Sequence, residues 1–251
     1  MLQSSPIRSS TAVLPQLAPP AARDGGSLSR FALFAEVGEL PLARLAREMT
    51  RHRFKAGEHL WYAGGKADHL TLIDDGIVEI ERTRRSGDGV ILGLFATGET
   101  VGLPAAIAHK PYPADAIALS DHVNIVRIRA PAMLQVMREH LPLALAVNHA
   151  LLQHNAALHA SIEIVGAGSV PKRLAALFLF LGRRFGTRTA SGGLHINLAL
   201  TREQIGRLVS ARVETVIRIM SRWQKAGWLN GARNGIDITR VDMLQRMSDA
   251  G

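Results

Sequence analysis

Residues 200–220 read LTREQIGRLVSARVETVIRIM, and this stretch decides the fold of the C-terminal third of the chain. Thr201 stands where a helix needs its N-cap, and Gly206 lies on the apolar face of the short helix that follows. Residues 209–212 form a turn, and Val213–Lys225 has the period of a second amphipathic helix. Two short helices joined by a tight turn, with a small residue at their crossing, predict a helix-turn-helix.

The second helix carries the residues expected to read DNA. In a helix-turn-helix this helix enters the major groove, and its N-terminal residues reach the base edges. A carboxylate accepts a hydrogen bond from cytosine N4, and an arginine donates to guanine O6 and N7. We therefore expect Val213, Glu214 and Arg218 to read bases. The alternative is an ordinary surface ion pair, because Glu214 and Arg218 are four residues apart.

Phosphate contacts are expected around the same helices. Thr201 and Arg202 begin the first helix, where a hydroxyl, backbone N–H groups and a guanidinium can together hold a phosphate. Arg212, Thr215 and Arg233 are predicted as further phosphate contacts.

A β-hairpin is predicted after the second helix. Trp228-Leu229 and Ile236–Ile238 supply its apolar strands, and Asn230-Gly231 and Asn234-Gly235 have the chemistry of hairpin turns. This hairpin would form a wing, with Arg233 near its tip.

The charge of the chain is divided unevenly. Residues 1–165 carry 16 basic and 16 acidic side chains, whereas residues 166–251 carry 14 basic and 5 acidic ones. The net charge of +9 therefore belongs to the last third of the chain. A neutral front and a basic back indicate one module that avoids polyanions and one that binds them. The alternative is a basic, well-solvated surface.

A long helix is predicted over about Leu141–Val165, and its heptad pattern predicts a dimer interface. Asparagine at an a position pairs with its symmetry mate and fixes the register of a parallel two-stranded coil. The expected interface residues, alternating a and d, are Leu141, Ala144, Asn148, Leu151, Asn155, Leu158, Ile162 and Val165. The alternative is a helix buried against its own subunit, since Leu143, Leu145, Val147 and Leu152 form a second apolar face.

The sequence pattern in the front half of the chain predicts β-structure. Between residues 54 and 128, short apolar runs alternate with glycine-containing turns, which predicts a compact β-roll. We expect a disordered tail over 1–27, a β-roll with flanking helices over 28–140, the long helix and a glycine hinge over 141–167, and a DNA-binding domain over 168–251. The tail carries four of the eleven prolines.

Composition excludes several kinds of site. The chain has no cysteine, so disulfides, thiolate metal sites, cysteine-held iron–sulfur clusters and cysteine nucleophiles are excluded. His149, His154 and His159 are five apart and do not share a helix face, so no metal site is expected. We expect no catalytic residues and no cofactor. No apolar run is long enough to span a membrane, and a cytoplasmic location is expected.

Residues 200–220, with QKAGWL at 224–229, closely resemble the winged helix-turn-helix of the Crp/Fnr transcription regulators. VET at 213–215 and Arg218 resemble the Fnr side of that family. The front half agrees with the family's cyclic-nucleotide-type β-roll through FKAGEHL at 54–60, GKADHLTLI at 65–73, GIVEI at 76–80 and TGETVG at 97–102. The resemblance implies an α+β chain: an N-terminal double-stranded β-roll, a long dimerisation helix and a C-terminal winged helix-turn-helix.

Three departures from the family bear on ligand binding by the β-roll and on the turn of the helix-turn-helix. Relatives that bind cyclic AMP carry a glutamate where this chain has Leu103, and an arginine pair near Pro113-Ala114. Without that arginine a buried phosphate lacks its counter-charge, so cyclic AMP is not the expected effector. Ser210 replaces a glycine that many relatives use in the turn, and strain is expected there.

Together these observations predict a homodimeric transcription regulator and no enzyme. It would bind duplex DNA at an inverted repeat with a TTGA-like core, and RNA polymerase is an expected partner. A haem-gated or small-molecule-gated version of the same fold remains open, with an unidentified small-molecule effector. A cupin-like metal enzyme with a basic appendage, and an RNA or membrane-surface binder, are weaker alternatives.

Overall fold

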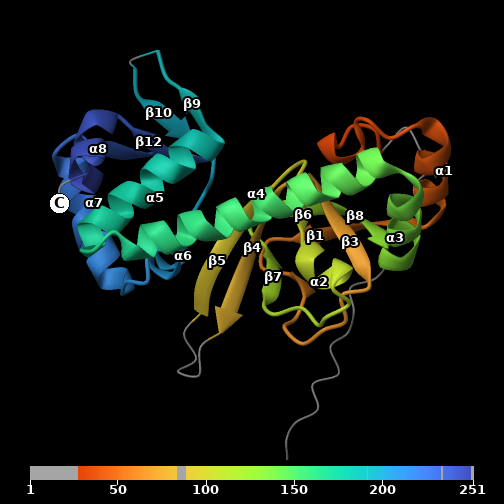
Figure 1. The fold of residues 1–251 in the computed structure, drawn as a ribbon. Coiled ribbons are helices and arrows are strands. Elements are labelled where there is room, and N and C mark those ends of the chain that lie inside the picture. Colours follow the sequence, from red (N-terminus) through yellow and green to blue (C-terminus); the bar gives the residue numbers. More distant parts are fainter. Residues whose placement is uncertain (1–27, 84–88, 191, 233, 250–251) are drawn as a thin grey trace, which may run out of the picture.

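The computed structural model describes residues 28–83, 89–190, 192–232 and 234–249. The predicted tail at 1–27 and the predicted phosphate contact Arg233 lie outside these residues. In the described part, a β-roll and a helical domain are joined by one long helix that runs across the molecule (Figure 1).

Two antiparallel four-stranded sheets make the β-roll. One has the order β1 (Met49–Lys55), β8 (His122–Arg129), β3 (His69–Asp75) and β6 (Thr100–Val101), and the other β2 (His59–Trp61), β7 (Asp115–Ala118), β4 (Ile77–Thr83) and β5 (Gly89–Ala96). Gly76 turns the chain from β3 into β4 at a φ of +99°, and a Cβ there would lie 2.5 Å from the His122 carbonyl oxygen. Only glycine fits this turn.

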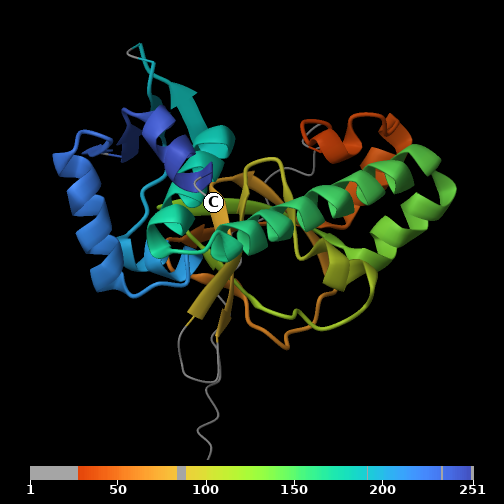
Figure 2. The ribbon, with the colours of Figure 1, turned by 60° about the vertical axis from the view of Figure 1, so that its left-hand side comes forward.

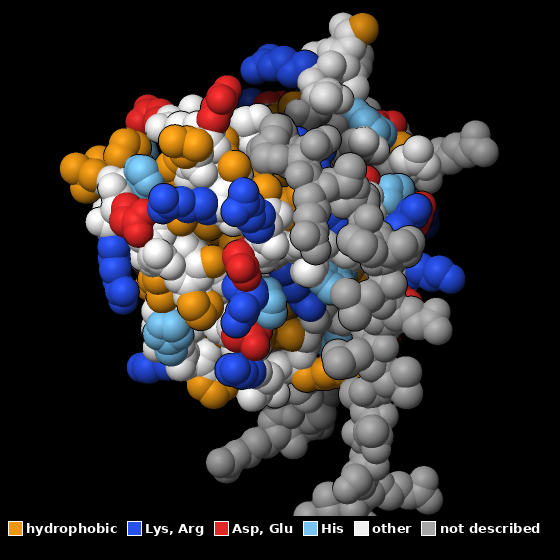
Figure 3. All heavy atoms as spheres, turned by 90° about the vertical axis from the view of Figure 1, so that its right-hand side faces the viewer, with side chains coloured by type: hydrophobic (Ala, Val, Ile, Leu, Met, Phe, Trp, Pro, Cys, Tyr) orange, Lys and Arg blue, Asp and Glu red, His pale blue; other side chains and the backbone are white. Residues whose placement is uncertain are grey.

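Both faces of the first sheet are buried. Its inner face packs against the second sheet in a core that includes Phe54, Val78 and Ile125. Its outer face packs under short helices and the start of the long helix. The short helices are η2 (Ala32–Phe34), α1 (Glu39–Arg47), α2 (Leu103–Ile107) and α3 (Ala130–Glu139). The surface at the β-roll end mixes basic, acidic and histidine side chains rather than forming a basic patch (Figure 3).

Helix α4 (Leu141–Gly166) links the two halves. Its 26 residues span about 39 Å at a rise of about 1.5 Å per residue. The helix is one residue longer than predicted. In the described part of the chain, no helix is both long enough and apolar enough to cross a membrane.

The C-terminal domain contains the predicted helix-turn-helix with the predicted limits for its second helix. Its elements are α5 (Val170–Phe185), β9 (Gly186–Arg188), β10 (Leu194–Ile196), α6 (Arg202–Leu208), α7 (Val213–Lys225), β11 (Leu229–Ala232), β12 (Gly235–Ile238) and α8 (Val241–Asp249). A four-stranded sheet of order β11-β12-β10-β9 lies beside the helices. Phe178 and Trp223 meet edge to face in the core of this domain.

One local prediction in this domain was wrong. Asn230 and Gly231 lie inside β11, paired with Asp237 and Ile236, because the hairpin register closes the strands at Ala232 and Gly235. Strand β10 ends at Ile196, where β9 and β12 both stop pairing with it. Helices α2 and α8 were not predicted.

Candidate nucleic-acid interface

Helix α6 begins with a reciprocal cap. The Gln204 backbone N–H donates to Thr201 Oγ1 at 3.1 Å, and the Thr201 N–H donates to Gln204 Oε1 at 2.9 Å. The cap uses the Thr201 oxygen as an acceptor, so the hydroxyl proton stays available for an outside acceptor. Thr201 is exposed. This N-terminus can therefore offer an O–H and backbone N–H groups to an anion.

Close packing of α6 on α7 depends on Gly206. A Cβ at this position would lie 2.8 Å from the Ala211 carbonyl oxygen and 3.8 Å from the Val216 side chain. The first distance is shorter than a normal contact, so a larger residue would push the two helices apart. The prediction of a small residue at the crossing is confirmed.

Ser210 occupies the strained position of the turn. Its φ is +49°, in the left-handed region that costs an L-residue energy. Arg173 of α5 holds the turn, since its Nη1 donates to the carbonyls of Val209 and Ser210 at 3.2 and 3.4 Å. The Ser210 hydroxyl is buried and has no hydrogen-bond partner in the described part of the chain.

Helix α7 has two distinct faces. Its buried face consists of Val216, Ile219, Met220 and Trp223. Glu214 and Arg218 are exposed on the opposite face, and among the described residues no ion pair joins them. The helix lies along the outer edge of the molecule, away from α4 and the β-roll (Figure 2). The surface ion pair considered as an alternative does not form, and both charged groups face solvent.

The other predicted contact residues lie at the two helix N-termini. Arg212 is the exposed N-cap residue of α7, Val213 is the first residue of that helix, and Thr215 lies within its first turn. Arg202 begins α6 and is half-buried, and this burial lowers the pKa of its guanidinium. An arginine nevertheless stays cationic at neutral pH. The interface therefore combines helix N-termini with two arginines.

An ion cluster that the sequence did not predict ties the helix-turn-helix to the β-roll. Arg207 of α6 pairs with Glu79, at 3.4 Å, and with Glu81, both on β4. Glu79 is only 2% exposed, and burial raises its pKa to about 6, although Arg207 opposes the rise. Glu79 and Glu81 stand two residues apart on this strand. Their alternate positions on one strand indicated a shared face but not what covers it.

A second link joins α5 to the β-roll. Arg184 pairs with Glu99 in the turn between β5 and β6, and the Ala96 N–H donates to the same carboxylate at 2.8 Å. His154 of α4 lies close by and stacks on Phe95 with ring centroids 5.0 Å apart. Burial lowers the pKa of His154. The described residues contain no group of three potential metal ligands.

The turn at Gly102 and Leu103 is tightly packed. Leu103 is fully buried in the apolar cluster on the outer face of the first sheet. Trp61 and Tyr112 stack with ring centroids 4.1 Å apart, and a Cβ on Gly102 would come within 3.0 Å of both. Trp61 Nε1 also donates to the Ala114 carbonyl at 3.2 Å. An aromatic pair thus occupies the space beside the Gly102 turn.

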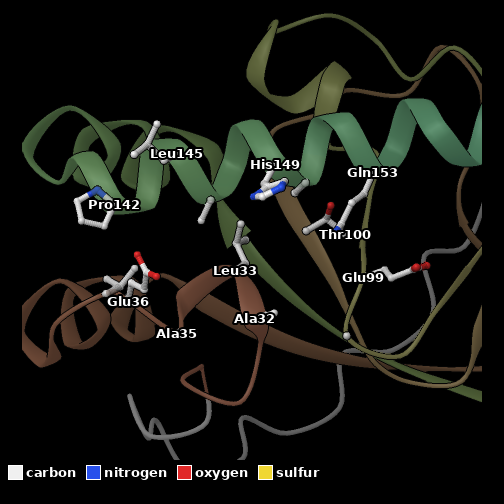
Figure 4. A pocket seen from close by; sticks show the side chains of 14 residues that line it. Ala32, Leu33, Ala35, Glu36, Glu99, Thr100, Pro142, Leu145, His149 and Gln153 are labelled. Atoms are coloured by element: carbon white, nitrogen blue, oxygen red, sulfur yellow. The ribbon is translucent and has the colours of Figure 1, made fainter.

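A hollow of about 290 Å³ lies between the η2 segment, the turn at 98–100 and α4 (Figure 4). Its walls come from the η2 segment, from the turn at 98–100 and from α4, which contributes Leu145, His149 and Gln153. Glu36 and Glu99 are its acidic lining residues, and the Glu99 carboxylate pairs with Arg184. Polar and apolar side chains line the hollow in similar measure.

Comparisons with known proteins match both halves. The cyclic nucleotide-binding domain family matches residues 51–140, and the Crp-like helix-turn-helix domain family matches residues 172–247. The chain belongs to the Crp/Fnr family of transcription regulators. It is 24% identical to the CRP-like cAMP-activated global transcriptional regulator of Mycobacterium tuberculosis over 219 residues, which is 87% of this chain and 97% of the relative.

Two further relatives agree. The fumarate and nitrate reduction regulatory protein of Escherichia coli is 25% identical over 231 residues, which is 88% of each chain. The solved structure of FixK2 from Bradyrhizobium japonicum has a TM-score of 0.69 at 16% identity, covering 81% of this chain and 98% of that one. This Crp/Fnr regulator is thus a DNA-binding protein with the predicted α+β fold, and not an enzyme.

Proposed function

We propose that this Crp/Fnr regulator acts as a homodimer and reads an inverted repeat through α7. The observation that carries the proposal is the two-faced α7, with four buried apolar residues on one side and the exposed Glu214 and Arg218 on the other. Two such helices related by a dimer axis would enter successive major grooves about 34 Å apart. The family likeness favours half-sites with a TTGA-like core.

Each contact residue has a role in this proposal. Val213, Glu214 and Arg218 read bases, with Val213 against a thymine methyl group. Thr201, Arg202, Arg212, Thr215 and Arg233 contact phosphates and position the helix without reading sequence. The basic excess of residues 166–251 supports this division, because phosphate contacts supply most of the affinity for any duplex.

A pair of substitutions tests the assignment. Arg218→Ala should cost about 1–3 kcal/mol at the preferred site and relax discrimination at one base pair, whereas Arg202→Ala should weaken binding to all sequences alike. Affinities for the preferred site and for single-base variants give both results. If both variants kept the same preferences and lost the same affinity, the division into base-reading and phosphate-contacting residues would be wrong.

We propose α4 as the dimer interface, because one of its faces is apolar and uncovered. Leu141 and Ile162 are each 68% exposed, and Leu145 and Leu152 are each 58% exposed. Asn148 and Asn155 are exposed on the same face. Exposed positions four and then three residues apart form a continuous heptad stripe, which suits a two-stranded coil.

Burial refines the predicted set of interface residues. Leu151 is half-buried against the β-roll core, and a methyl group of Leu158 lies 3.9 Å from the place of a Cβ on Gly93 in β5. Leu143 and Val147 are buried within the subunit, as the alternative expected, but Leu145 and Leu152 of the same predicted face are exposed. We therefore propose that Leu145 and Leu152 contribute more to the dimer interface than Ala144 and Leu151. Leu158 and Val165 would lie at the margin of this interface. The other predicted interface residues are retained: Leu141, Asn148, Asn155 and Ile162.

The oligomeric state tests this interface. Leu145→Glu combined with Leu152→Glu should convert a dimer into a monomer in light scattering, because four carboxylates would face one another across the axis. Leu40→Glu is the matched control, since Leu40 is 80% exposed on α1, outside the stripe. A double variant that remained dimeric would contradict the proposed interface.

The effector is proposed to be neither cyclic AMP nor an iron–sulfur cluster. The buried Leu103 and the Trp61–Tyr112 stack support the first part, and the absence of cysteine supports the second. Cyclic AMP at millimolar concentration should leave the melting temperature unchanged, and a clear rise would contradict this. The hollow in Figure 4 favours a small-molecule effector as a second candidate, and an absorption spectrum of the purified protein tests for haem.

The remaining assignments follow from the family likeness. RNA polymerase is the proposed protein partner, and the cytoplasm is the proposed location. We propose domain limits of 28–140 for the β-roll with its flanking helices, 141–167 for the dimer helix and hinge, and 168–251 for the DNA-binding domain.

A further inference from the structure

One apolar side chain on the proposed DNA-facing surface has no evident role in the fold. Ile217 of α7 is 46% exposed, and no other large apolar side chain in the described residues of the DNA-binding domain is exposed to this degree. The other apolar residues on this helix are at least partly covered by protein. Exposing much of an isoleucine to water is unfavourable, so a binding partner that covers it would gain free energy.

The helical period places Ile217 beside the residues proposed to read bases. It lies one turn after Val213, three residues after Glu214 and next to Arg218. Val213 is half-buried and Ile217 is exposed, so the two form an apolar strip along one edge of the Glu214–Arg218 pair. Any duplex that contacts both charged groups must also come close to this strip.

The chemistry of the major groove gives the strip one suitable contact. Base edges there present hydrogen-bond donors and acceptors, and the C5-methyl group of thymine is their apolar feature. We propose that Ile217 reads a thymine methyl group in each half-site, at a base different from the one that Val213 contacts. This inference rests on the proposed function and adds a specificity-determining residue to it.

Replacing thymine by deoxyuridine tests the contact, because this removes the methyl group and leaves base pairing unchanged. The full-length protein is assayed on its selected site, with one thymine of a half-site replaced at a time. At the thymine read by Ile217, the wild-type dissociation constant should rise about fourfold, the value of one buried methyl group. Ile217→Ala should bind the thymine and uracil duplexes equally at that position.

Matched variants separate this contact from its neighbours. Ser221→Ala alters an exposed side chain one turn further along the same helix, so it should keep the full response to uracil. Val213→Ala should lose the response at a different thymine. Circular dichroism melting shows whether each variant remains folded.

The outcomes are distinguishable. An Ile217→Ala variant that keeps every response would overturn the inference and leave the proposed function intact. A wild-type protein that binds its site but is insensitive to uracil at every thymine would overturn the inference together with the Val213 contact, and leave the dimeric binding of an inverted repeat intact. A wild-type protein without preference for any duplex would overturn the proposed function, and the inference with it.

Discussion

The helix-turn-helix and the β-roll are both built as in the Crp/Fnr family, but they differ in which side chains they leave exposed. In the helix-turn-helix, Glu214 and Arg218 are exposed, and no ion pair joins them within the described part of the chain. In the β-roll, Trp61 and Tyr112 fill the space beside Gly102, and Leu103 is part of the core. One half therefore keeps charged side chains at its surface, whereas the other fills the space beside Gly102 with an aromatic pair.

The largest expected effect concerns the aromatic pair of the β-roll. Trp61 is 9% exposed and stacks on Tyr112, so Trp61→Ala should lower the free energy of unfolding by about 3–5 kcal/mol. Tyr62→Ala is the control at the next residue, which is 54% exposed and stacks on His59, and it should lower the free energy of unfolding by no more than about 1.5 kcal/mol. Urea unfolding measures both. Equal losses of unfolding free energy in the two variants would show that the Trp61–Tyr112 pair is not part of the packed β-roll.

A smaller effect concerns the contact between the halves. The pKa of Glu79 is about 6, above its ordinary value of 4.5, so the folded protein keeps a proton there that the unfolded chain loses. Stability should therefore fall as the pH rises from 4.5 to 6, by on the order of 2 kcal/mol. Unfolding free energies measured across this range should show the decline.

Two variants isolate this effect. Glu79→Gln should flatten the decline, because an amide does not titrate. Arg207→Ala should move the decline to higher pH, because Arg207 lowers the pKa of Glu79. A Glu79→Gln profile with the wild-type slope would assign the pH dependence to other groups.

The smallest expected effect concerns the turn of the helix-turn-helix. Ser210 has a φ of +49°, which glycine adopts without strain, so Ser210→Gly should stabilise the protein by about 0.5–1 kcal/mol. The same change in the middle of α7, Ser221→Gly, should destabilise it by a similar amount. Thermal unfolding compares the two, and a loss of stability in Ser210→Gly would mean that the turn carries no strain.

The helix-turn-helix was predictable from the sequence because its signals are local. The cap at Thr201, the small Gly206 and the period of Val213–Lys225 all lie within 25 residues, and the structure reproduces the predicted limits of α7. Strain at Ser210 was expected from the family resemblance, because many relatives have glycine there, and its φ of +49° confirms the expectation.

The parts that escaped prediction depend on contacts between distant segments. Arg207 and Glu81 are 126 residues apart in the chain, and no local pattern joins them. The long helix was predicted, but which of its faces meets solvent depends on where the β-roll covers it. For that reason the exposed stripe includes Leu145 and Leu152, whereas the heptad pattern favoured Ala144 and Leu151.

The central claim is that α7 reads base edges in a twofold-symmetric complex. Selection of bound sites from random duplex DNA by the full-length protein tests it most directly. The expected result is an inverted repeat whose half-site centres lie one helical turn apart. Selection with the Arg218→Ala variant should give a repeat in which one base pair of each half-site is no longer specified. Failure to enrich any sequence over random competitor, or an unchanged repeat with Arg218→Ala, would contradict the account.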